Sequence, residues 1–340
     1  MKKRKRSSQR ATMSEVAQLA DVSPSTVSLY LRRPDEVSSR RAERIQTAID
    51  KLSYLPNTMA GGLASSRSNI IGVIVPTITF SFFSETLETL ERNLRAAGYQ
   101  LLIGNTEFDA SREEELIRSI LSWNPSGLVL TGFSHSRKSV SLLSNSDIPI
   151  IEMWDYGQEG LDMVVGFSHR TCGRLVAEHL MRSGYQHMAF LSTNFQRDIR
   201  ANERYLGFHD AIAAAGGSVL VRELTGRSNT AEAGQLLCTL VNDHPEIQAV
   251  FCSNDMVALG AMLECQRQGW SIPERLAIVG FGNQDFTDST VPPMTTVDPP
   301  RQEIGTHIAR LLLERLKGDD TANMDTRVDL GVRLIIRESA

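Results

Sequence analysis

Residues 12–28 read TMSEVAQLADVSPSTVS, and this stretch decides how the first part of the chain folds. Its apolar residues recur at the i, i+3, i+4 and i+7 spacing from Met13 to Ala20, which is typical of one face of an amphipathic helix. Thr12 stands where an N-cap is expected, and Glu15 follows three residues later, as in a capping box. The spacing therefore predicts a short helix that begins just after Thr12.

A second helix is predicted directly after a short turn. Ser23 can cap it, and Pro24 takes the first helical position, where its missing N–H costs nothing. A third amphipathic pattern follows at residues 39–53, and three helices this short must pack on one another to be stable. A helix, a tight turn and a second helix with small hydroxyl residues on its outer face predict a helix-turn-helix unit that approaches DNA. A generic three-helix bundle is the alternative.

The charge of the chain is unevenly distributed. Residues 1–67 hold 13 Lys and Arg against 6 Asp and Glu, whereas the remainder holds 23 against 34. A basic head on an acidic body indicates a polyanion as the partner of the head alone. For residues 2–10, a basic tail that only aids solubility is an equal alternative.

From residue 70 onward, apolar β-rich runs alternate with amphipathic helical stretches. Unbroken apolar runs suit strands buried on both faces of a parallel sheet, and their alternation with helices predicts a doubly wound α/β fold. Two sheets with a cleft between them suit the number of runs best. The chain is expected to cross between the lobes at 164–166 and 295–300, to return to the first lobe as a helix over 301–317, and to end in a strand of the second at 332–337. The strand candidates are 70–75, 100–103, 127–130, 149–153, 188–191, 249–252 and 276–279.

Several classes of protein are disfavoured by the same sequence. No apolar run approaches the roughly 18 residues of a membrane helix, and no apolar segment follows the basic start as in a signal peptide. The four cysteines show no C-x-x-C spacing and are interpreted as reduced core thiols of a cytosolic protein. No common nucleotide-binding, metalloprotease or serine-hydrolase motif is present, so we expect no enzyme, no metal and no cofactor.

The chain resembles the lac repressor family of bacterial transcription regulators over nearly its whole length after residue 11. The matching motifs occur in the family's order at 12–17, 22–28, 52–57, 60–64, 69–76, 252–261, 278–281 and 334–337. The resemblance implies a DNA-binding head at 1–54, a hinge helix and linker at 55–68, and an effector-binding and dimerisation core at 69–340. The core would resemble periplasmic sugar-binding proteins, with one lobe at about 69–166 and 297–325 and the other at about 167–296 and 326–340.

The resemblance also implies which residues touch DNA. The second helix would enter the major groove, with four residues facing bases and two facing phosphates, and paired hinge helices would enter the minor groove. Leu63 would be a wedge between base pairs, since an apolar side chain on a weak helix can open a base step; a core leucine is the alternative. The implied contacts are Pro24, Ser25, Ser28 and Leu29 to bases, Thr12 and Thr26 to phosphates, and Asn57, Ala60 and Leu63 in the hinge.

One position of the predicted recognition helix departs from the family pattern. Members often carry Arg or another polar residue where this chain has Leu29. Leucine cannot donate to guanine, although it can contact a thymine methyl group, so the family's half-site is not carried over.

The resemblance places an effector pocket between the lobes. Phe82 and Phe83 match a position for an aromatic ring against the ligand, Arg204 matches an arginine that binds effector oxygens, and Asn254 matches a polar contact. Where many members carry an Asp that binds sugar hydroxyls, this chain has Gly282. The neighbour of Asn254, Asp255, is expected to cap the following helix instead.

A closer likeness to the gluconate-operon repressors of this family lies at 122–131, 152–155 and 161–167. Together with the cations Arg197 and Arg200, it favours an anionic effector such as gluconate or a ketogluconate, because arginine matches carboxylate geometry. His135 and Asp155 are then polar pocket candidates. Solvent-exposed loop positions are the alternative for the two arginines and for His135.

The sequence thus predicts a cytosolic homodimeric repressor of a sugar-acid utilisation operon, released from a near-palindromic operator by its effector. One alternative is a regulator of the same family that answers a neutral sugar or a purine, with the ligand promoting DNA binding. A sugar-binding transport protein or a sugar-processing enzyme on the same core is less favoured.

Overall fold

The computed structural model describes residues 11–55, 68–78, 81–157, 159–225, 229–318 and 325–340; the side chains of Arg32, Ser81 and Phe82 are also outside the description. The chain forms two compact units, Met1–Ser68 and Asn69–Ala340, each considered by itself. None of the helices in the described ranges is long and apolar enough to cross a membrane.

The first unit is the predicted three-helix head. It comprises α1 (Met13–Ala20), α2 (Pro24–Arg32), a 3₁₀ turn η1 (Pro34–Glu36) and α3 (Ser39–Leu52). Both halves of the capping box between Thr12 and Glu15 are formed, and the Ser23 hydroxyl accepts a hydrogen bond from the Thr26 N–H. The residues buried between the helices are Val16, Ala17, Ala20, Val27, Val37, Ile45, Ala48 and Tyr54. The predicted hinge helix, with Asn57, Ala60 and Leu63, lies outside the described residues.

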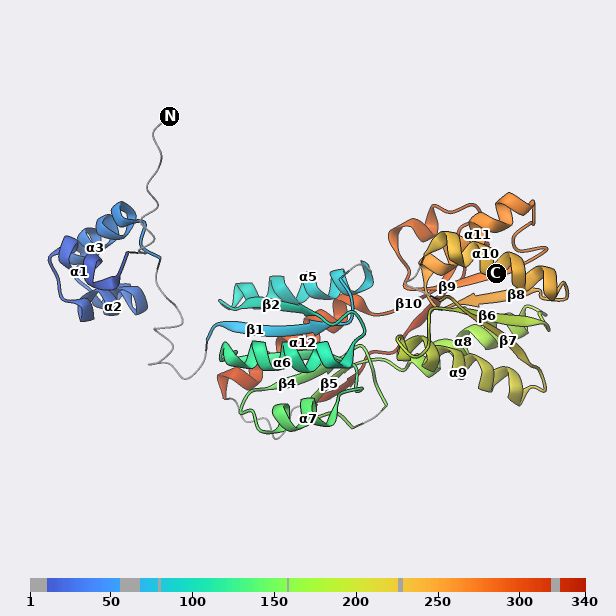
Figure 1. Ribbon diagram of the computed structural model, residues 1–340, viewed down its shortest axis with the longest axis horizontal. Coiled ribbons are helices and arrows are strands. Elements are labelled where there is room, and N and C mark those ends of the chain that lie inside the picture. The colour runs from blue at the N-terminus through green and yellow to red at the C-terminus, as the bar shows by residue number, and fades with distance from the viewer. Residues whose placement is uncertain (1–10, 56–67, 79–80, 158, 226–228, 319–324) are drawn as a thin grey trace, which may run out of the picture. The chain divides into compact units, whose positions relative to one another are not determined.

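The second unit contains two six-stranded sheets, as the apolar runs predict (Figure 1). In the first sheet the order is β11 (Arg327–Asp329), β5 (Met163–Gly166), β4 (Ile150–Met153), β3 (Gly127–Thr131), β1 (Ile70–Val75) and β2 (Gln100–Asn105). In the second it is β12 (Arg333–Ile335), β10 (Thr295–Asp298), β9 (Ala277–Phe281), β8 (Ala249–Cys252), β6 (Met188–Ser192) and β7 (Val219–Glu223).

The pairing is parallel throughout except between β10 and β12, which run antiparallel. Helices cover both sheets (Figure 1). Those of the first lobe are α5 (Ser81–Ala96), α6 (Ala110–Ser122), α7 (Arg137–Ser144) and α12 (Arg301–Lys317). Those of the second are α8 (His169–Arg182), α9 (Ile199–Ala214), α10 (Thr230–Asp243) and α11 (Asp255–Gln268), with a short 3₁₀ turn η2 (Asp285–Asp288).

Helix α12 packs against α5 in the first lobe, as predicted for the returning helix. The chain then forms β11, a strand that the sequence analysis did not anticipate and that pairs with β5 in the first sheet. The predicted lobe boundary after residue 325 is therefore wrong, because Arg327–Asp329 belong to the first lobe. Likewise, β10 continues to Asp298 in the second sheet, where it pairs with β9 and β12. The predicted boundary between 296 and 297 therefore falls inside this strand, two residues before its end.

The four cysteines are free thiols. Cys172, Cys252 and Cys265 are buried and Cys238 is half-buried. Burial raises the pKa of Cys172 and Cys265 to about 12, so these thiols stay protonated.

Candidate functional site

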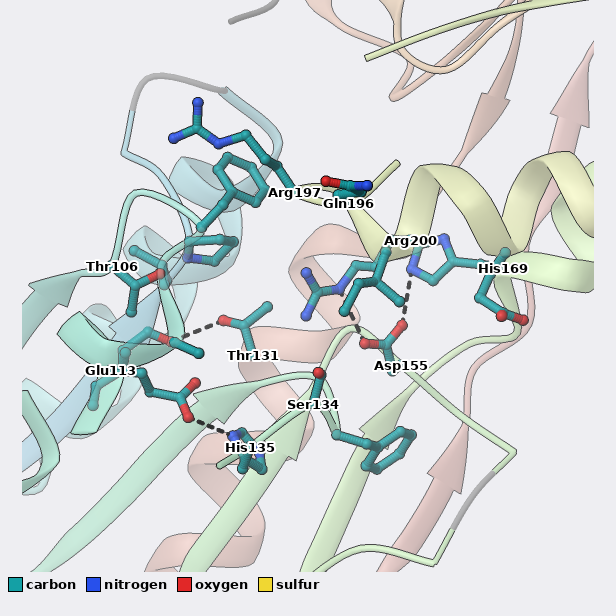
Figure 2. A pocket seen from close by; sticks show the side chains of 18 of the residues that line it. Thr106, Glu113, Thr131, Ser134, His135, Asp155, His169, Gln196, Arg197 and Arg200 are labelled. Atoms are coloured by element: carbon teal, nitrogen blue, oxygen red, sulfur yellow. Dashed lines mark hydrogen bonds and ion pairs between the residues drawn. The ribbon is translucent and has the colours of Figure 1, made fainter. Parts of the chain in front are cut away.

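A cavity of about 860 Å³ lies between the two lobes of the second unit (Figure 2). Its first-lobe wall is built from residues that follow the carboxyl ends of β1, β2, β3 and β4, the edge at which ligands of open parallel sheets bind. Its second-lobe wall is built from the first turn of α8 and from the segment 196–203 that opens α9. Both lobes therefore contribute side chains to one cavity.

Asp155 joins the two walls. It follows β4 in the first lobe, and its Oδ2 lies 3.0 Å from Nε of Arg200, while its Oδ1 lies 3.2 Å from Nε2 of His169 (Figure 2). Burial alone would raise the pKa of Asp155, but Arg200 and His169 outweigh it and lower that pKa. An ionised carboxylate of one lobe is thus paired with a cation of the other.

The backbone of Gly132 passes directly against this ion pair. A Cβ atom at this position would clash with Nη2 of Arg200 and with Oδ2 of Asp155. Its φ of +79° is in addition a conformation that side-chain-bearing residues rarely adopt. A larger residue here would therefore displace the guanidinium and the carboxylate and would also strain the backbone.

Behind the ion pair, His169 connects Asp155 to Arg204. His169 Nδ1 lies 3.0 Å from Nη1 of Arg204, which can only donate, so Nδ1 must accept and Nε2 carries the proton. That Nε2–H is 3.0 Å from the carbonyl oxygen of Trp154. Burial lowers the pKa of His169, which agrees with a neutral ring in this position.

Arg204 is only 3% exposed and is held from three sides. Besides donating to His169, it donates to the carbonyl oxygen of Ser253 at 2.9 Å, and its guanidinium lies 4.1 Å above the ring of Phe281. It does not line the cavity.

A second charged group lies at the first-lobe wall. His135 Nδ1 is 2.8 Å from Oε1 of Glu113, and its Nε2 is 3.3 Å from Oε1 of Glu152. Burial would lower the pKa of His135, but the two carboxylates outweigh it and raise the pKa to about 9. His135 is therefore an imidazolium at neutral pH.

The structure brings together part of the predicted effector site. His135, Asp155 and Arg200 line the cavity. Phe83 is buried and packs edge-to-face against Trp154, with 4.9 Å between the ring centroids, and it does not line the cavity. Gly282, which has a φ of +130°, does not line the cavity. The side chain of Phe82 lies outside the described residues.

The helix-capping prediction for Asp255 is wrong. Asn254, which does not line the cavity, is the N-cap of α11, since its side chain accepts from the Val257 N–H at 3.0 Å. Asp255 instead accepts hydrogen bonds from the Thr296 hydroxyl at 2.6 Å and from the Gln284 N–H at 2.9 Å. Burial raises the pKa of Asp255 to about 6.

Sequence reasoning did not single out Glu113, His169 or Glu203, which also line the cavity. A signal for Glu113 exists: it shares the i, i+4, i+7 face of α6 with Ile117 and Ile120, and all three are buried. A charged residue on an apolar helix face is costly unless it has a partner, and that marks it for attention.

In the head, the predicted DNA-contacting residues form part of the surface of α2 and the start of α1. Thr12, Pro24 and Ser25 are exposed, while Thr26, Ser28 and Leu29 are half-buried. Several of these hydroxyls already have local partners: Thr12 is part of the capping box, and the hydroxyls of Ser25 and Thr26 lie 2.7 and 2.8 Å from the Ser23 hydroxyl. Leu29 also packs against the apolar centre of the head.

Comparison with known proteins shows which protein families the two units match. Residues 12–57 match the model for bacterial regulatory proteins of the lacI family, and residues 177–340 match the periplasmic binding protein-like domain. A regulator named GntR from Pseudomonas aeruginosa is 37% identical over 339 residues, which cover 99% of this chain and 98% of the relative.

Two further similarities cover almost the whole chain. The transcriptional regulator GntR of Escherichia coli K12 is 32% identical over 328 residues, covering 96% of this chain and 97% of the relative. A crystal structure of a lacI-family transcriptional regulator from Silicibacter pomeroyi is similar with a TM-score of 0.91 and 31% identity, over 97% of this chain and 99% of that one.

Proposed function

The chain belongs to the lacI family of bacterial regulatory proteins and is a ligand-responsive transcription regulator rather than an enzyme, and on this premise we propose that its effector is a sugar acid such as gluconate. We further propose that the protein binds a near-palindromic operator as a homodimer and leaves it when the effector binds. The observation that carries the effector proposal is the position of Arg200 in the cavity between the lobes.

Arg200 suits the binding of a carboxylate. Its side chain is 15% exposed, and Nε faces Asp155, while neither terminal Nη atom donates a hydrogen bond to a residue within the described ranges. A planar guanidinium can bind a carboxylate with two parallel hydrogen bonds, so these Nη atoms are a suitable site for an acid. Arg197, exposed at the rim, adds a second positive charge.

The rest of the cavity suits a polyhydroxylated chain. Thr106, Thr131, Ser134 and Gln196 line it alongside the charged groups (Figure 2). Hydroxyl and amide groups both donate and accept hydrogen bonds, as sugar hydroxyls require. The resemblance of three segments to gluconate-operon repressors, and the relatives named GntR, support the same ligand class.

The other predicted residues have more indirect roles in this proposal. Arg204 holds His169 and thereby the orientation of Asp155. Residues 1–54 bind DNA, 55–68 form the hinge, and closure of the lobes on the effector changes how two hinges fit DNA. The DNA contacts proposed are Thr12, Pro24, Ser25, Thr26, Ser28, Leu29, Asn57, Ala60 and Leu63.

Titration calorimetry on the full chain tests the effector. Gluconate, 2-ketogluconate and glucose are titrated into wild type, Arg200→Ala and a control, Arg174→Ala, whose arginine is paired with Glu178 on the outer surface of α8. A charge-assisted hydrogen bond lost from a closed site costs about 1.5–3 kcal/mol, so Arg200→Ala should bind either acid roughly tenfold to hundredfold more weakly. Equal binding by wild type and Arg200→Ala would refute the role of Arg200.

A neutral effector is the alternative, and one feature favours it. Asp155 already neutralises Arg200, and Phe108, Phe133 and Tyr156 line the cavity with aromatic surface on which a ring could pack. Tighter binding of glucose or a purine base than of either acid would select this alternative. If that ligand strengthened DNA binding, it would be a corepressor.

A further inference from the structure

We propose that Glu113 is the carboxylate that binds hydroxyl groups of the effector and that His135 is the residue that positions it. This inference rests on the proposed sugar-acid effector and adds a second subsite to it. Arg200 comes from α9 in the second lobe, whereas Glu113 comes from α6 in the first, so the two subsites lie on different walls of one cavity (Figure 2).

Four carboxylates line the cavity, and three of them are engaged or exposed. Both oxygens of Asp155 face a partner, Arg200 for one and His169 for the other. Asp109 is exposed and its Oδ1 caps α6 through the Ser111 N–H at 2.8 Å. Glu203 Oε2 is 2.8 Å from Nε of Arg170, and both of these side chains are well exposed.

Glu113 differs from these three. The residue is 9% exposed, and only its Oε1 is used, by His135. Within the described ranges no group donates a hydrogen bond to Oε2. Oε2 is not one of the buried polar atoms that lack a partner within the described residues, so it is accessible from the cavity that Glu113 lines. An ionised carboxylate can only accept, so a ligand group that binds Oε2 must be a donor. Among the groups of a sugar acid, the hydroxyls are the donors.

His135 fixes this acceptor in place. Its side chain is 2% exposed, and it bridges Glu113 to Glu152, whose Oε2 in turn accepts from the Leu161 N–H at 2.6 Å. The bridge ties the first turn of α6 to β4, so Oε2 is held at one position before any ligand arrives. An acceptor that is already oriented loses less entropy on binding.

The two subsites also orient the ligand. Two carboxylates around one imidazolium leave the first-lobe group with a net negative charge, which repels the carboxylate of an acid. Arg200 attracts it. An acid should therefore bind with its carboxylate toward α9 and its hydroxyls toward Glu113. Glu113 would then set which hydroxyl positions are read.

A hydroxyl scan tests the inference. Gluconate and its monodeoxy derivatives are titrated by calorimetry into wild type, Glu113→Gln, and the control Glu115→Gln, which removes the same charge from an exposed position of the same helix. Wild type and the control should bind at least one monodeoxy derivative about tenfold more weakly than gluconate, the loss expected for a hydrogen bond to a charged group.

In Glu113→Gln the affinities for gluconate and that derivative should differ by no more than about twofold. The hydrogen bond between Glu113 and the hydroxyl is already lost in this variant, so removing the hydroxyl as well costs little more. An equal loss of affinity for gluconate and every derivative would mean that Glu113 only tethers α6, and would overturn the inference. Failure of wild type to bind any sugar acid would overturn the proposed function and this inference with it. DNA binding without effector checks the fold of each variant. If Glu113→Gln does not fold, Glu113→Asp, which keeps the charge beside His135, replaces it. The inference then also requires that the affinity difference between gluconate and the monodeoxy derivative be lost in Glu113→Asp.

Discussion

At the scale of single residues, the cavity depends on an ion pair whose two members come from different lobes. Asp155 is ionised because Arg200 and His169 face it, and it therefore opposes any movement that would separate it from them. An effector carboxylate that binds the Nη atoms of Arg200 would share this cation with Asp155. The same residues can thus sense the ligand and hold the lobes.

Replacing Gly132 tests how closely the backbone must approach this ion pair. In Gly132→Ala the added Cβ would clash with Arg200 and Asp155. Gly98→Ala is a matched control, since Gly98 has a similar φ of +84° but nothing within 4 Å of a Cβ. Overpacking typically costs about 1–3 kcal/mol, so Gly132→Ala should unfold more easily than the control by that amount in urea. Equal losses in both variants would mean that backbone strain alone matters.

His135 predicts a pH dependence of stability. Its pKa in the folded protein is about 9, above the ordinary 6.5, so the imidazolium favours the folded state. Its contribution is complete below pH 6.5 and is lost as the pH rises to 9, by on the order of 3 kcal/mol. Urea unfolding of wild type at pH 6.5 and pH 9 should show this loss. His135→Gln should lack this loss, and His209→Gln, at a half-buried position of α9 outside the cavity, should keep it. The same pH slope in all three proteins would contradict the assignment.

Part of the site could be predicted from sequence, and the rest could not, for a physical reason. Arg200, Asp155 and His135 were identified by residue type and resemblance, but Arg204 was expected at the ligand and is instead covered by His169, Ser253 and Phe281. Residues 200 and 204 lie one turn apart on α9. Which of them reaches the cavity depends on how that helix packs, and a periodic pattern does not reveal it.

At the scale of elements, the local signals were most reliable where capping and burial agree. Ser23 and Pro24 begin α2 as predicted, and the buried strands β1, β3, β6, β8 and β9 coincide with the apolar runs. Four of the described strands were not predicted. Strands β5 and β10 lie inside the sheets, in segments that were expected only to cross between the lobes. Strands β7 and β11 are edge strands with mostly half-buried residues and with charged residues in their sequences. Edge strands have fewer neighbours to bury, so their sequences lack the continuous apolar run.

Helix α2 carries the proposed base contacts, and Leu29 is the position to change. If Leu29 meets a thymine methyl group, Leu29→Arg should alter the preferred base at one position of each half-site, by about 1–3 kcal/mol. Selection from a randomised DNA pool measures this. Since Leu29 also packs against the head, thermal unfolding of the variant is the control. An unchanged consensus with an intact head would show that Leu29 is only a packing residue.

The hinge is proposed to act through Leu63. An apolar wedge that opens a central base step should make Leu63→Ala bind its specific site more weakly and bend DNA less. Binding to non-specific DNA should change little, because that affinity comes from phosphate contacts. Gel-shift assays with circularly permuted fragments report both affinity and bend. Unchanged values of both would identify Leu63 as a core residue.

At the scale of the whole core unit, the two lobes are connected three times. The chain passes from β5 to α8, from β10 to α12, and from β11 to β12. The first of these connections leads directly into the cavity residues Ser168 and His169. Three adjacent connections, with a cavity between the two lobes, allow the lobes to close around a ligand. A ligand can shift such an equilibrium only through contacts that differ between the open and closed arrangements. Simultaneous contact with Arg200 and Glu113 would be such a difference.

We propose that a sugar acid bound between the lobes controls DNA binding by the head. The most direct measurement is the affinity of the full chain for its best selected DNA site, by fluorescence anisotropy, with increasing gluconate or 2-ketogluconate. Glucose is the neutral control and Arg200→Ala the control variant. We predict that at least one acid weakens DNA binding by wild type by about tenfold or more, within the range of allosteric coupling energies, that glucose does not, and that Arg200→Ala needs far more acid. DNA affinity of wild type that is unaffected by either acid, or that responds equally to glucose, would contradict the claim.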